Sequence, residues 1–325
     1  MTSPALPAAL KAALEAKLQG FARGEIAARA ERISKTYRDG GGSAAIKSES
    51  DALAYALARM PATYAAATAC LNALKEARPD FAPQSQLDVG AGPGTASFAA
   101  AEAFSSLRTF TLFDANDALR GFARDLAQTS ARFNALNYQA GDACALLGKA
   151  NAADLVVASY LIGELAEAKQ TDLTERLWSQ TADTLLIVEP GTPRGYGRII
   201  AARAQLIASG AYVLAPCPHD APCPLQAPDW CHFVQRLPRA RAHKELKGAQ
   251  LPFEDEKFSY VILTRKPVTH RRARVLAPPN VTKVEITAKL CTPDRLSYAK
   301  VPHRDKPAYA TARRWRWGDA VIAQG

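Results

Sequence analysis

The stretch of sequence that decides the fold reads Leu87-Asp88-Val89-Gly90-Ala91-Gly92-Pro93-Gly94. An apolar strand carries an acidic residue near its end, and three glycines follow at a spacing of two residues. A backbone can approach a ligand closely only where there is no Cβ, and glycine also permits a sharp turn from strand to helix. A helix-like run, Thr95 to Phe104, comes directly after the loop. The pattern is therefore typical of a loop that binds a nucleotide-type cofactor. Its spacing is G-x-G-x-G, not the G-x-G-x-x-G of dinucleotide-binding proteins.

The loop resembles the first motif of class I S-adenosylmethionine (SAM) methyltransferases, with Asp88 two residues ahead of the first glycine. A SAM site needs backbone contacts for the methionine carboxylate and amine, close to a helix N-terminus. We expect Gly90, Gly92 and Gly94 to supply that backbone. We expect Asp88 to bind the methionine ammonium, directly or through water.

Two more acidic residues follow at places where ligand groups are recognised in such folds. The ribose hydroxyls need an acidic acceptor, usually at the end of the second strand about twenty residues past the loop. Asp114 ends the strand Thr109 to Phe113 and has this position; its other interpretation is the N-cap of the next helix. Asp142, after Gly141, is a candidate for binding the adenine amino group, with a plain turn residue as the alternative.

Strand-like and helix-like runs alternate from residue 81 onward. We expect strands at Gln86 to Val89, Thr109 to Phe113, Asn137 to Gln139, Ala153 to Ser159 and Thr184 to Val188. The helices are expected at Thr95 to Phe104, Asp117 to Gln128, Leu173 to Ala182 and Gly197 to Ala208. This alternation predicts an α/β fold with a mostly parallel, doubly wound sheet of the class I SAM-methyltransferase kind. Two further runs, Cys231 to Leu237 and Phe258 to Leu263, are expected to form its antiparallel edge pair.

Composition divides the chain into three regions. Residues 1–80 are Ala-rich with helical spacing and predict a helical N-terminal region, in which Ser50 is a candidate helix cap. Residues 81–265 hold the methyltransferase-like domain, including a Cys-rich loop at 215–233. Residues 266–325 form a basic extension that is expected to be rich in strands, for example over Val281 to Leu290. This extension holds thirteen Lys or Arg and four Asp or Glu, a net of +9 in a chain of net charge +10.

The excess positive charge favours a polyanionic partner. No apolar run approaches the ~20 residues that span a bilayer, so no membrane partner is expected. The start of the chain lacks the order of a signal peptide, and its glutamates argue against a transit peptide. We therefore expect a cytoplasmic protein.

The sequence carries a weaker signal for the residues that would contact the methyl acceptor. Methyltransferases that act on amines often carry Asn/Asp-Pro-Pro-Tyr after the fourth strand, whereas this chain has Ser159-Tyr160-Leu161-Ile162-Gly163-Glu164. Glu164 and Glu189 lie at strand ends that face the expected ligand. Either is a weak candidate for a catalytic base, and helix capping or a loop salt bridge is the alternative for both.

Three of the six cysteines fall within fifteen residues, at Cys217, Cys223 and Cys231. In a chain of this size such a cluster more often indicates metal binding or catalysis than disulfides. Five prolines stiffen the loop and lower the entropy that metal binding would cost. Cys70 and Cys144 stand alone and are expected in the core.

Three thiolates suit either Zn²⁺ or an iron–sulfur cluster, and both need a fourth ligand. The candidates for it are Cys291, His219 and His232. Zinc motifs usually pair cysteines at C-x2–4-C, and none is found here. The spacing C-x5-C-x7-C and the Cys-Pro dipeptides favour [4Fe–4S], with Zn²⁺ as the alternative. A radical SAM enzyme is disfavoured because its usual C-x3-C-x2-C is missing.

With these motifs the chain resembles the Rsm-type family, a methyltransferase-like family associated with the small ribosomal subunit in bacteria and mitochondria. The resemblance covers roughly residues 50–300. The residues that carry it are the glycine loop, Ser159-Tyr160-Leu161-Ile162-Gly163-Glu164-Leu165, Val188-Glu189-Pro190-Gly191-Thr192-Pro193, Cys217-Pro218-His219, Cys223-Pro224, Asp229-Trp230-Cys231-His232-Phe233 and Phe253-Glu254-Asp255-Glu256-Lys257-Phe258-Ser259-Tyr260.

The resemblance implies a [4Fe–4S] cluster on four cysteines, of which three map to Cys217, Cys223 and Cys231. The fourth lies well downstream in that family, and Cys291 is the cysteine available there. The resemblance also implies a role in small-subunit assembly or translation through contact with 16S-type ribosomal RNA, and no DNA partner is expected. Two hypotheses remain open: a SAM-binding assembly factor, or an active SAM-dependent rRNA methyltransferase. In the first, basic residues of the extension would neutralise phosphates, and Trp315 and Trp317 would stack on bases. The alternative for the extension is a solvated surface whose aromatic residues pack inward.

Overall fold

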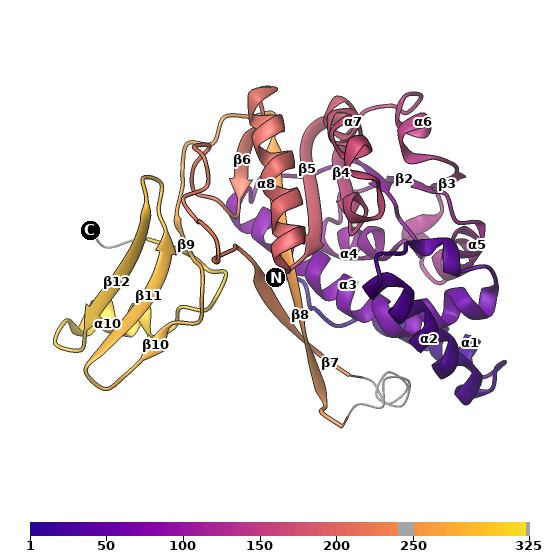
Figure 1. Ribbon diagram of the computed structural model, residues 1–325, viewed down its shortest axis with the longest axis horizontal. Helices are drawn as coiled ribbons and strands as arrows, with labels where there is room; N and C mark the ends of the chain where they lie inside the picture. The colour runs from indigo at the N-terminus through magenta and orange to yellow at the C-terminus, as the bar shows by residue number, and fades with distance from the viewer. Residues whose placement is uncertain (240–249, 323–325) are drawn as a thin grey trace.

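The computed structural model describes residues 1–239 and 250–322. Its centre is an eight-stranded sheet, and a second, five-stranded sheet is built from residues 273–321. Figure 1 shows helices on both faces of the large sheet and the second sheet at one end of the molecule. The hairpin of β7 (Phe233–Pro238) and β8 (Phe253–Thr264) projects from the large sheet, between the second sheet and the N-terminal helices.

The strands of the large sheet and the helices between them follow the alternation expected from the sequence. The strands are β1 (Ser85–Val89), β2 (Thr109–Asp114), β3 (Leu136–Ala140), β4 (Ala153–Ser159), β5 (Thr181–Pro190), β6 (Tyr212–Ala215), β7 (Phe233–Pro238) and β8 (Phe253–Thr264). The helices are α4 (Thr95–Ala103), α5 (Asp117–Ala127), α6 (Ala143–Leu147), α7 (Glu167–Ser179) and α8 (Pro193–Ala208), with short 3-10 turns η2 (Ala131–Phe133) and η3 (Ile162–Glu164).

The strand order is β3-β2-β1-β4-β5-β8-β6, with β7 paired to β8. Strands β1 to β5 are parallel, and β8 runs antiparallel to β5, β6 and β7. This order, with one antiparallel strand inserted near the edge, is that of the class I SAM-methyltransferase sheet, a Rossmann-like α/β fold. The order reverses between β1 and β4, so ligands of such sheets bind at the carboxyl ends of these two strands.

The central strands are apolar on both faces because helices cover both. Successive residues of β4 point to opposite sides: Leu155 and Val157 join the core beneath α3, whereas Val156 and Ala158 join the core beneath α7 and α8. All four are buried. A continuous apolar run, rather than an alternating one, is what a covered parallel sheet requires.

The N-terminal helices lie on one face of this sheet. They are α1 (Ala8–Leu18), α2 (Arg23–Arg38) and α3 (Glu49–Ala77), with the 3-10 turn η1 (Ser43–Ala45) between α2 and α3. Ser48, not Ser50, caps α3, since its hydroxyl accepts the N–H of Asp51. The helix of 29 residues then crosses the sheet and contacts both α4 and β8.

The second sheet contains β9 (Ala273–Val275), β10 (Asn280–Val281), β11 (Glu285–Cys291), β12 (Leu296–Pro302) and β13 (Ala320–Val321), and carries α10 (Lys306–Ala312). On β11, Ile286 faces α10 and packs with Val301, Ala308 and Ala312. The strands expected near Val281 to Leu290 are thus present, split by a turn.

Several expectations for single elements differ from the structure, and helices α7 and α8 begin earlier than expected, at Glu167 and Pro193. The sheet edge is β6, a strand of four residues whose apolar signal is too short to stand out. The run Cys231 to Leu237 instead forms the hairpin strand β7 outside the main order. Helix α7 ends at Ser179 because Thr181 already belongs to β5.

Candidate functional site

The glycine loop leaves β1 in a conformation that few other residues adopt. Gly90, Gly92 and Gly94 have φ of 69°, 53° and 77°, in the left-handed region that favours glycine. A Cβ on Gly90 would lie 2.7 Å from a methyl carbon of Leu161, so this position has no room for one. A Cβ on Gly92 would have no atom nearer than 3.9 Å, which leaves space beside the backbone there.

Asp114 is held at the end of β2 by the glycine loop. Its Oδ2 accepts the N–H of Gly92 at 2.8 Å, and its Oδ1 accepts the N–H of Asn116 at 2.8 Å. The cap of α5 is Asn116, whose side chain accepts the N–H of Leu119, so the alternative role of Asp114 as the N-cap is wrong. Burial raises the pKa of Asp114, and these N–H groups oppose the shift. The carboxylate stands where a ribose is expected, and that role stays a prediction.

Asp88 is fully buried at the end of β1. The hydroxyl of Ser97 donates to its Oδ2 at 2.7 Å, whereas its Oδ1 has no hydrogen-bond partner among the described residues. Burial raises the pKa of Asp88 to about 7. Because a buried acceptor without a partner is costly, an ammonium group or a water at Oδ1 would satisfy it.

The raised pKa of Asp88 predicts how stability depends on pH. The folded chain holds this proton more tightly than the unfolded chain, so this carboxyl stabilises the fold least above pH 7 and most below pH 4. Relative to an Asp88→Asn variant, the wild type should lose free energy of unfolding as the pH rises from 4 to 7.5. Urea unfolding without cofactor at several pH values measures this difference, and parallel pH profiles would contradict it.

Asp142 lies on the surface after β3. Its Oδ1 accepts the N–H of Ala145 at 3.0 Å and so caps α6. The side chain is exposed, and its role toward adenine stays a prediction.

Glu164 and Glu189 occupy different surroundings. Glu189 is fully buried, and Arg198 donates to it at 3.0 Å, so this carboxylate forms the salt bridge that the sequence left as an alternative. Burial raises the pKa of Glu189, and Arg198 opposes the shift. Glu164 accepts the N–H of Ser43. Desolvation is the main cause that raises the pKa of Glu164 to about 7, and the charge of Asp114 raises it further. The residue nevertheless remains exposed to solvent.

The structure adds a polar cluster of Tyr160, Glu256 and Arg59 that sequence reasoning missed. Tyr160 has a left-handed φ of 58°, which is strained for a side chain of this size. Its hydroxyl donates to Glu256 at 3.0 Å, and Arg59 of α3 lies 3.4 Å from the same oxygen. A positive φ at a non-glycine residue has no sequence signal, and the contact to Arg59 joins residues about two hundred positions apart.

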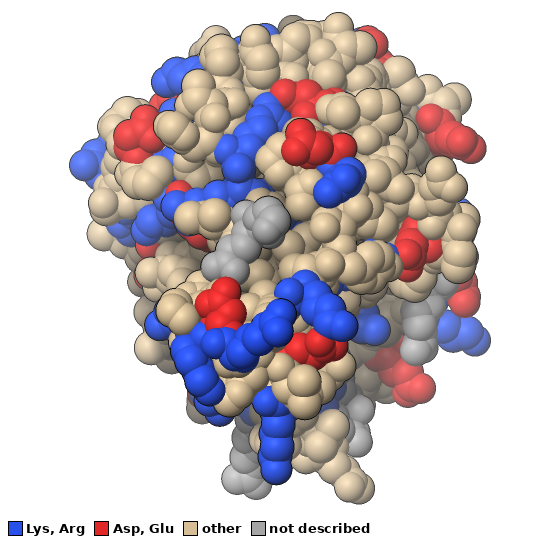
Figure 2. Space-filling model, turned by 90° about the vertical axis from the view of Figure 1, so that its left-hand side faces the viewer, with Lys and Arg blue, Asp and Glu red and all other residues tan. Residues whose placement is uncertain are grey.

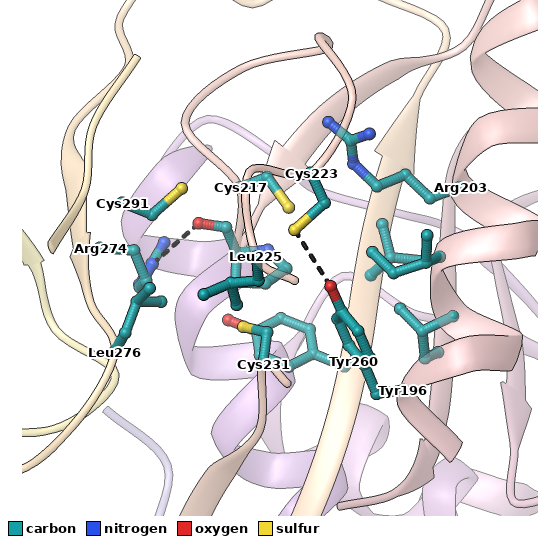
Figure 3. A pocket seen from close by; sticks show the side chains of 14 residues that line it. Tyr196, Arg203, Cys217, Cys223, Leu225, Cys231, Tyr260, Arg274, Leu276 and Cys291 are labelled. Carbon is teal, nitrogen blue, oxygen red and sulfur yellow. Dashed lines mark hydrogen bonds between the residues drawn. The ribbon is translucent and has the colours of Figure 1, made fainter. Parts of the chain in front are cut away.

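The four cysteines named from the sequence line one pocket. Cys217, Cys223 and Cys231 come from the loop between β6 and β7, and Cys291 comes from the end of β11. Figure 3 shows the four side chains around the same space, with Leu225 between them. The structure thus brings the thiols of two separate segments together. Burial raises the pKa of Cys231, and the neighbouring thiols raise it further.

Hydrogen bonds from the surrounding elements fix the cysteine loop. Tyr196 of α8 donates to Sγ of Cys223 at 3.2 Å. Ser259 of β8 donates to the carbonyl of Cys231 at 2.8 Å. The indole of Trp230 donates to the carbonyl of Gly191 at 3.0 Å, which ties the loop to the end of β5.

Two buried arginines stand beside the thiols. Arg203 donates to the carbonyls of His219 and Ala221 at 2.7 and 2.9 Å, and Arg274 donates to the carbonyls of Pro216 and Gly318 at 3.0 and 2.7 Å. Neither forms an ion pair with any residue in the described ranges. Since a buried charge is costly without a counter-charge, this donor set fits an anionic centre of four thiolates.

No group of three or more His, Cys, Asp or Glu side chains forms a ready-made site for a metal ion within residues 1–239 and 250–322. Of the two histidines considered as the fourth ligand, His219 has its Nε2 3.5 Å from Sγ of Cys291. His232 stacks on Trp230 and meets Trp317 edge-on. The ligand set of the centre therefore stays a prediction.

The cysteines outside the pocket have core positions. Cys70 is fully buried in α3, and Cys144 is partly buried against the core beneath α7 and α8. The two tryptophans of the extension also pack inward: Trp315 lies against the cores of the second sheet, and Trp317 contacts the main core. Both rings are therefore only partly exposed, which disfavours the expected stacking of bases on them.

The profile of a family described as "Mitochondrial small ribosomal subunit Rsm22" matches residues 49–322. The chain is 28% identical to the human "Ribosome assembly protein METTL17, mitochondrial" over 83% of this chain and 62% of that protein. It is 27% identical to "Rsm22-cox11 tandem protein 2, mitochondrial" of Schizosaccharomyces pombe over 84% of this chain and 43% of that protein.

Among solved structures, magnesium protoporphyrin IX methyltransferase from Synechocystis PCC 6803 with bound SAH matches 63% of this chain and 84% of its own, at 12% identity and a TM-score of 0.42. The chain spans about three fifths of the human relative's length and less than half of the fission yeast relative's. In the part of the chain that the structure describes, no helix is long and apolar enough to cross a membrane.

Proposed function

This chain belongs to the Rsm22 family, and from that premise we propose that it is a SAM-binding, iron–sulfur assembly factor of the small ribosomal subunit. The observation that carries the proposal is the single pocket lined by Cys217, Cys223, Cys231 and Cys291. The pocket lies between the methyltransferase-like sheet and the second sheet, which belongs to the basic C-terminal extension. Such a protein would recognise the small subunit through the RNA of that subunit. We propose that it acts in the cytoplasm, whereas the relatives named above are mitochondrial.

SAM binding is supported by the fit of the residues at the ends of β1 and β2. Gly92 leaves space beside the backbone, Asp88 has one oxygen without a partner, and Asp114 is held in place by the loop. Asp88 would hold the methionine ammonium and Asp114 the ribose hydroxyls. When bound, SAM would supply a sulfonium methyl group at this edge of the sheet.

A centre with four cysteine ligands is supported by the chemistry of the donors. Four thiolates carry more negative charge than one Zn²⁺ or one [4Fe–4S]²⁺ core neutralises. The guanidinium groups of Arg203 and Arg274 would balance part of the remainder. The wide spacing of the cysteines favours [4Fe–4S] over Zn²⁺. A fully ligated centre has a structural role, because it ties Cys291 of the second sheet to the loop.

Contact with 16S-type rRNA is supported by the charge of the C-terminal module, here residues 266–322. Figure 2 looks onto the end of the molecule that this module forms, and Lys and Arg side chains are more numerous there than Asp and Glu. Neutralisation of phosphates by such side chains releases counterions, which makes the affinity depend steeply on salt.

This dependence is the test of the proposed function. Binding to immature small subunits should weaken at least roughly tenfold between 50 and 200 mM salt, given several phosphate contacts. Sedimentation of labelled protein with purified particles measures it. Binding that is absent at low salt, or that does not change with salt, would overturn the proposal.

An active rRNA methyltransferase is the second candidate, and Glu164 is the observation in its favour. A carboxyl with a pKa of about 7 can accept a proton at neutral pH. Incubation with labelled SAM and immature subunits should then transfer label, and Glu164→Gln should reduce the transfer. Intact SAM binding without any transfer would leave the assembly factor alone.

A further inference from the structure

We infer that one face of the second sheet is a binding surface for single-stranded RNA, on which a base stacks on Tyr298. We call this surface the open face and define it by Asn280, Thr287, Tyr298 and Lys300. The inference rests on the proposed function and deepens it, because it names the surface and the form of RNA.

The strand register places these residues on one side of the sheet. In antiparallel strands directly opposed residues share a face. Lys289 is opposite Tyr298, Thr287 is opposite both Lys300 and Asn280, and Cys291 is opposite Leu296. The open face is therefore the same side of the sheet that presents Cys291 to the pocket.

The other side of the sheet is already covered. Ile286 and Val301 are opposite each other and pack against Ala308 and Ala312 of α10. Apolar residues thus fill the side toward α10. Across the sheet the strands carry an aromatic ring, a hydroxyl, an amide and an ammonium group, which are side chains suited to nucleotides.

Among the aromatic side chains of the described residues, Tyr298 is unusually exposed, with 71% of its surface open to solvent. Lys289, which is opposite it on β11, forms an ion pair with Asp229 of the cysteine loop. Bases stack on such rings with little regard to sequence, and single strands are recognised in this way on sheet surfaces.

Further cations lie on β12 and next to the ends of these strands. Lys300 stands two residues further along β12, and its ion pair with Glu285 is exposed and therefore weak. Lys283, Arg295 and Arg304 lie in the turns and segment next to these strands. All three are exposed and form no ion pair with any described residue. An exposed aromatic ring on a sheet whose neighbouring turns carry unpaired cations suits a polymer of bases and phosphates, which favours RNA over a protein partner.

The test is binding of a fluorescein-labelled twelve-nucleotide oligouridylate to the full chain, measured by anisotropy. Tyr298→Ala should weaken binding by about 5- to 100-fold, the range for one lost stack. Tyr298→Phe should keep the affinity to within about twofold, because the ring remains. Tyr212→Ala, at an exposed tyrosine on β6, is the matched control and should change nothing.

The salt dependence separates stacking from charge. Lys300→Ala should reduce the slope of log affinity against log salt by about 0.7, the value for one phosphate on a single strand. Tyr298→Ala should leave this slope unchanged. Melting temperatures equal to the wild type's would show that each variant is folded, as expected for exposed positions.

An unchanged oligouridylate affinity in folded Tyr298→Ala would overturn the inference. If this variant nevertheless lost binding to small subunits, the open face would be a docking site for a ribosomal protein instead. Failure of the wild type to bind small subunits would instead refute the proposed function, whatever the oligonucleotide shows.

Discussion

Replacement of Cys223 by serine is expected to remove the proposed iron–sulfur centre and to lower the melting temperature by on the order of 10 °C. The thiol is one of four that line the pocket, and Tyr196 donates to it. Loss of a metal centre is one of the few single changes that cost more than ~4 kcal/mol, and each kcal/mol lowers the melting temperature by about 2–4 °C in a domain of this size. Iron and sulfide analysis of anaerobically purified protein, its brown absorbance and calorimetry measure the effect.

The matched control is Cys144→Ser, which changes a partly buried cysteine outside the pocket. It should keep iron, sulfide and absorbance at wild-type levels. Cys291→Ser should behave like Cys223→Ser if the second sheet supplies the fourth ligand. Wild-type absorbance and melting in Cys223→Ser would refute the assignment, and zinc without sulfide in the native protein would replace the cluster with the alternative metal.

The second large effect is expected at Asp114. Asp114→Ala should weaken the binding of S-adenosylhomocysteine at least roughly 100-fold. The complex would lose the two charge-assisted hydrogen bonds from the ribose hydroxyls to this carboxylate, each worth about 1.5–3 kcal/mol. The change would also release the N–H of Gly92 that Asp114 accepts. Isothermal titration calorimetry measures the affinity.

Asp117→Ala is the control for this substitution, since Asp117 is an exposed carboxylate three residues away. It should bind S-adenosylhomocysteine like the wild type. Asp114→Asn should lie between, because an amide keeps an acceptor for one N–H of the loop. Equal affinities in the wild type and Asp114→Ala would remove the ribose role of this residue and weaken the case for SAM.

The cofactor edge of the sheet was predictable because its signals are local. The loop from Gly90 to Gly94 and the strand that ends at Asp114 are each contained in a few residues. Backbone conformation and strand periodicity are properties of such short stretches. The parallel order of β1 to β5 followed from their alternation with helices.

The surroundings of the cysteines were not predictable, although the cysteines themselves were. Arg203 and Arg274 are two of many arginines in the sequence, and nothing local indicates that they are buried beside thiols. Their carbonyl partners come from other segments of the fold. Likewise the bond from Tyr160 to Glu256 depends on the packing of β8 against β5, which no short pattern encodes.

In the basic extension, too, short sequence patterns did not show which side chains are exposed. The run of arginines and tryptophans near Trp315 and Trp317 suggested a surface for stacking, but both rings pack inward. The exposed ring is Tyr298, which stands in an ordinary strand. Which side of a strand faces solvent is decided by the partner that covers the other side, here α10.

The position of Cys291 has a consequence for how the chain matures. It follows Cys231 by about sixty residues, so the pocket cannot be complete until synthesis has passed Cys291. The earlier domain can fold first, as domains generally do during synthesis. A chain that stops short of β11 would thus have only three of the four thiols beside the buried Arg203 and Arg274. If the proposed centre forms, its insertion would distinguish chains that include β11 from chains that do not.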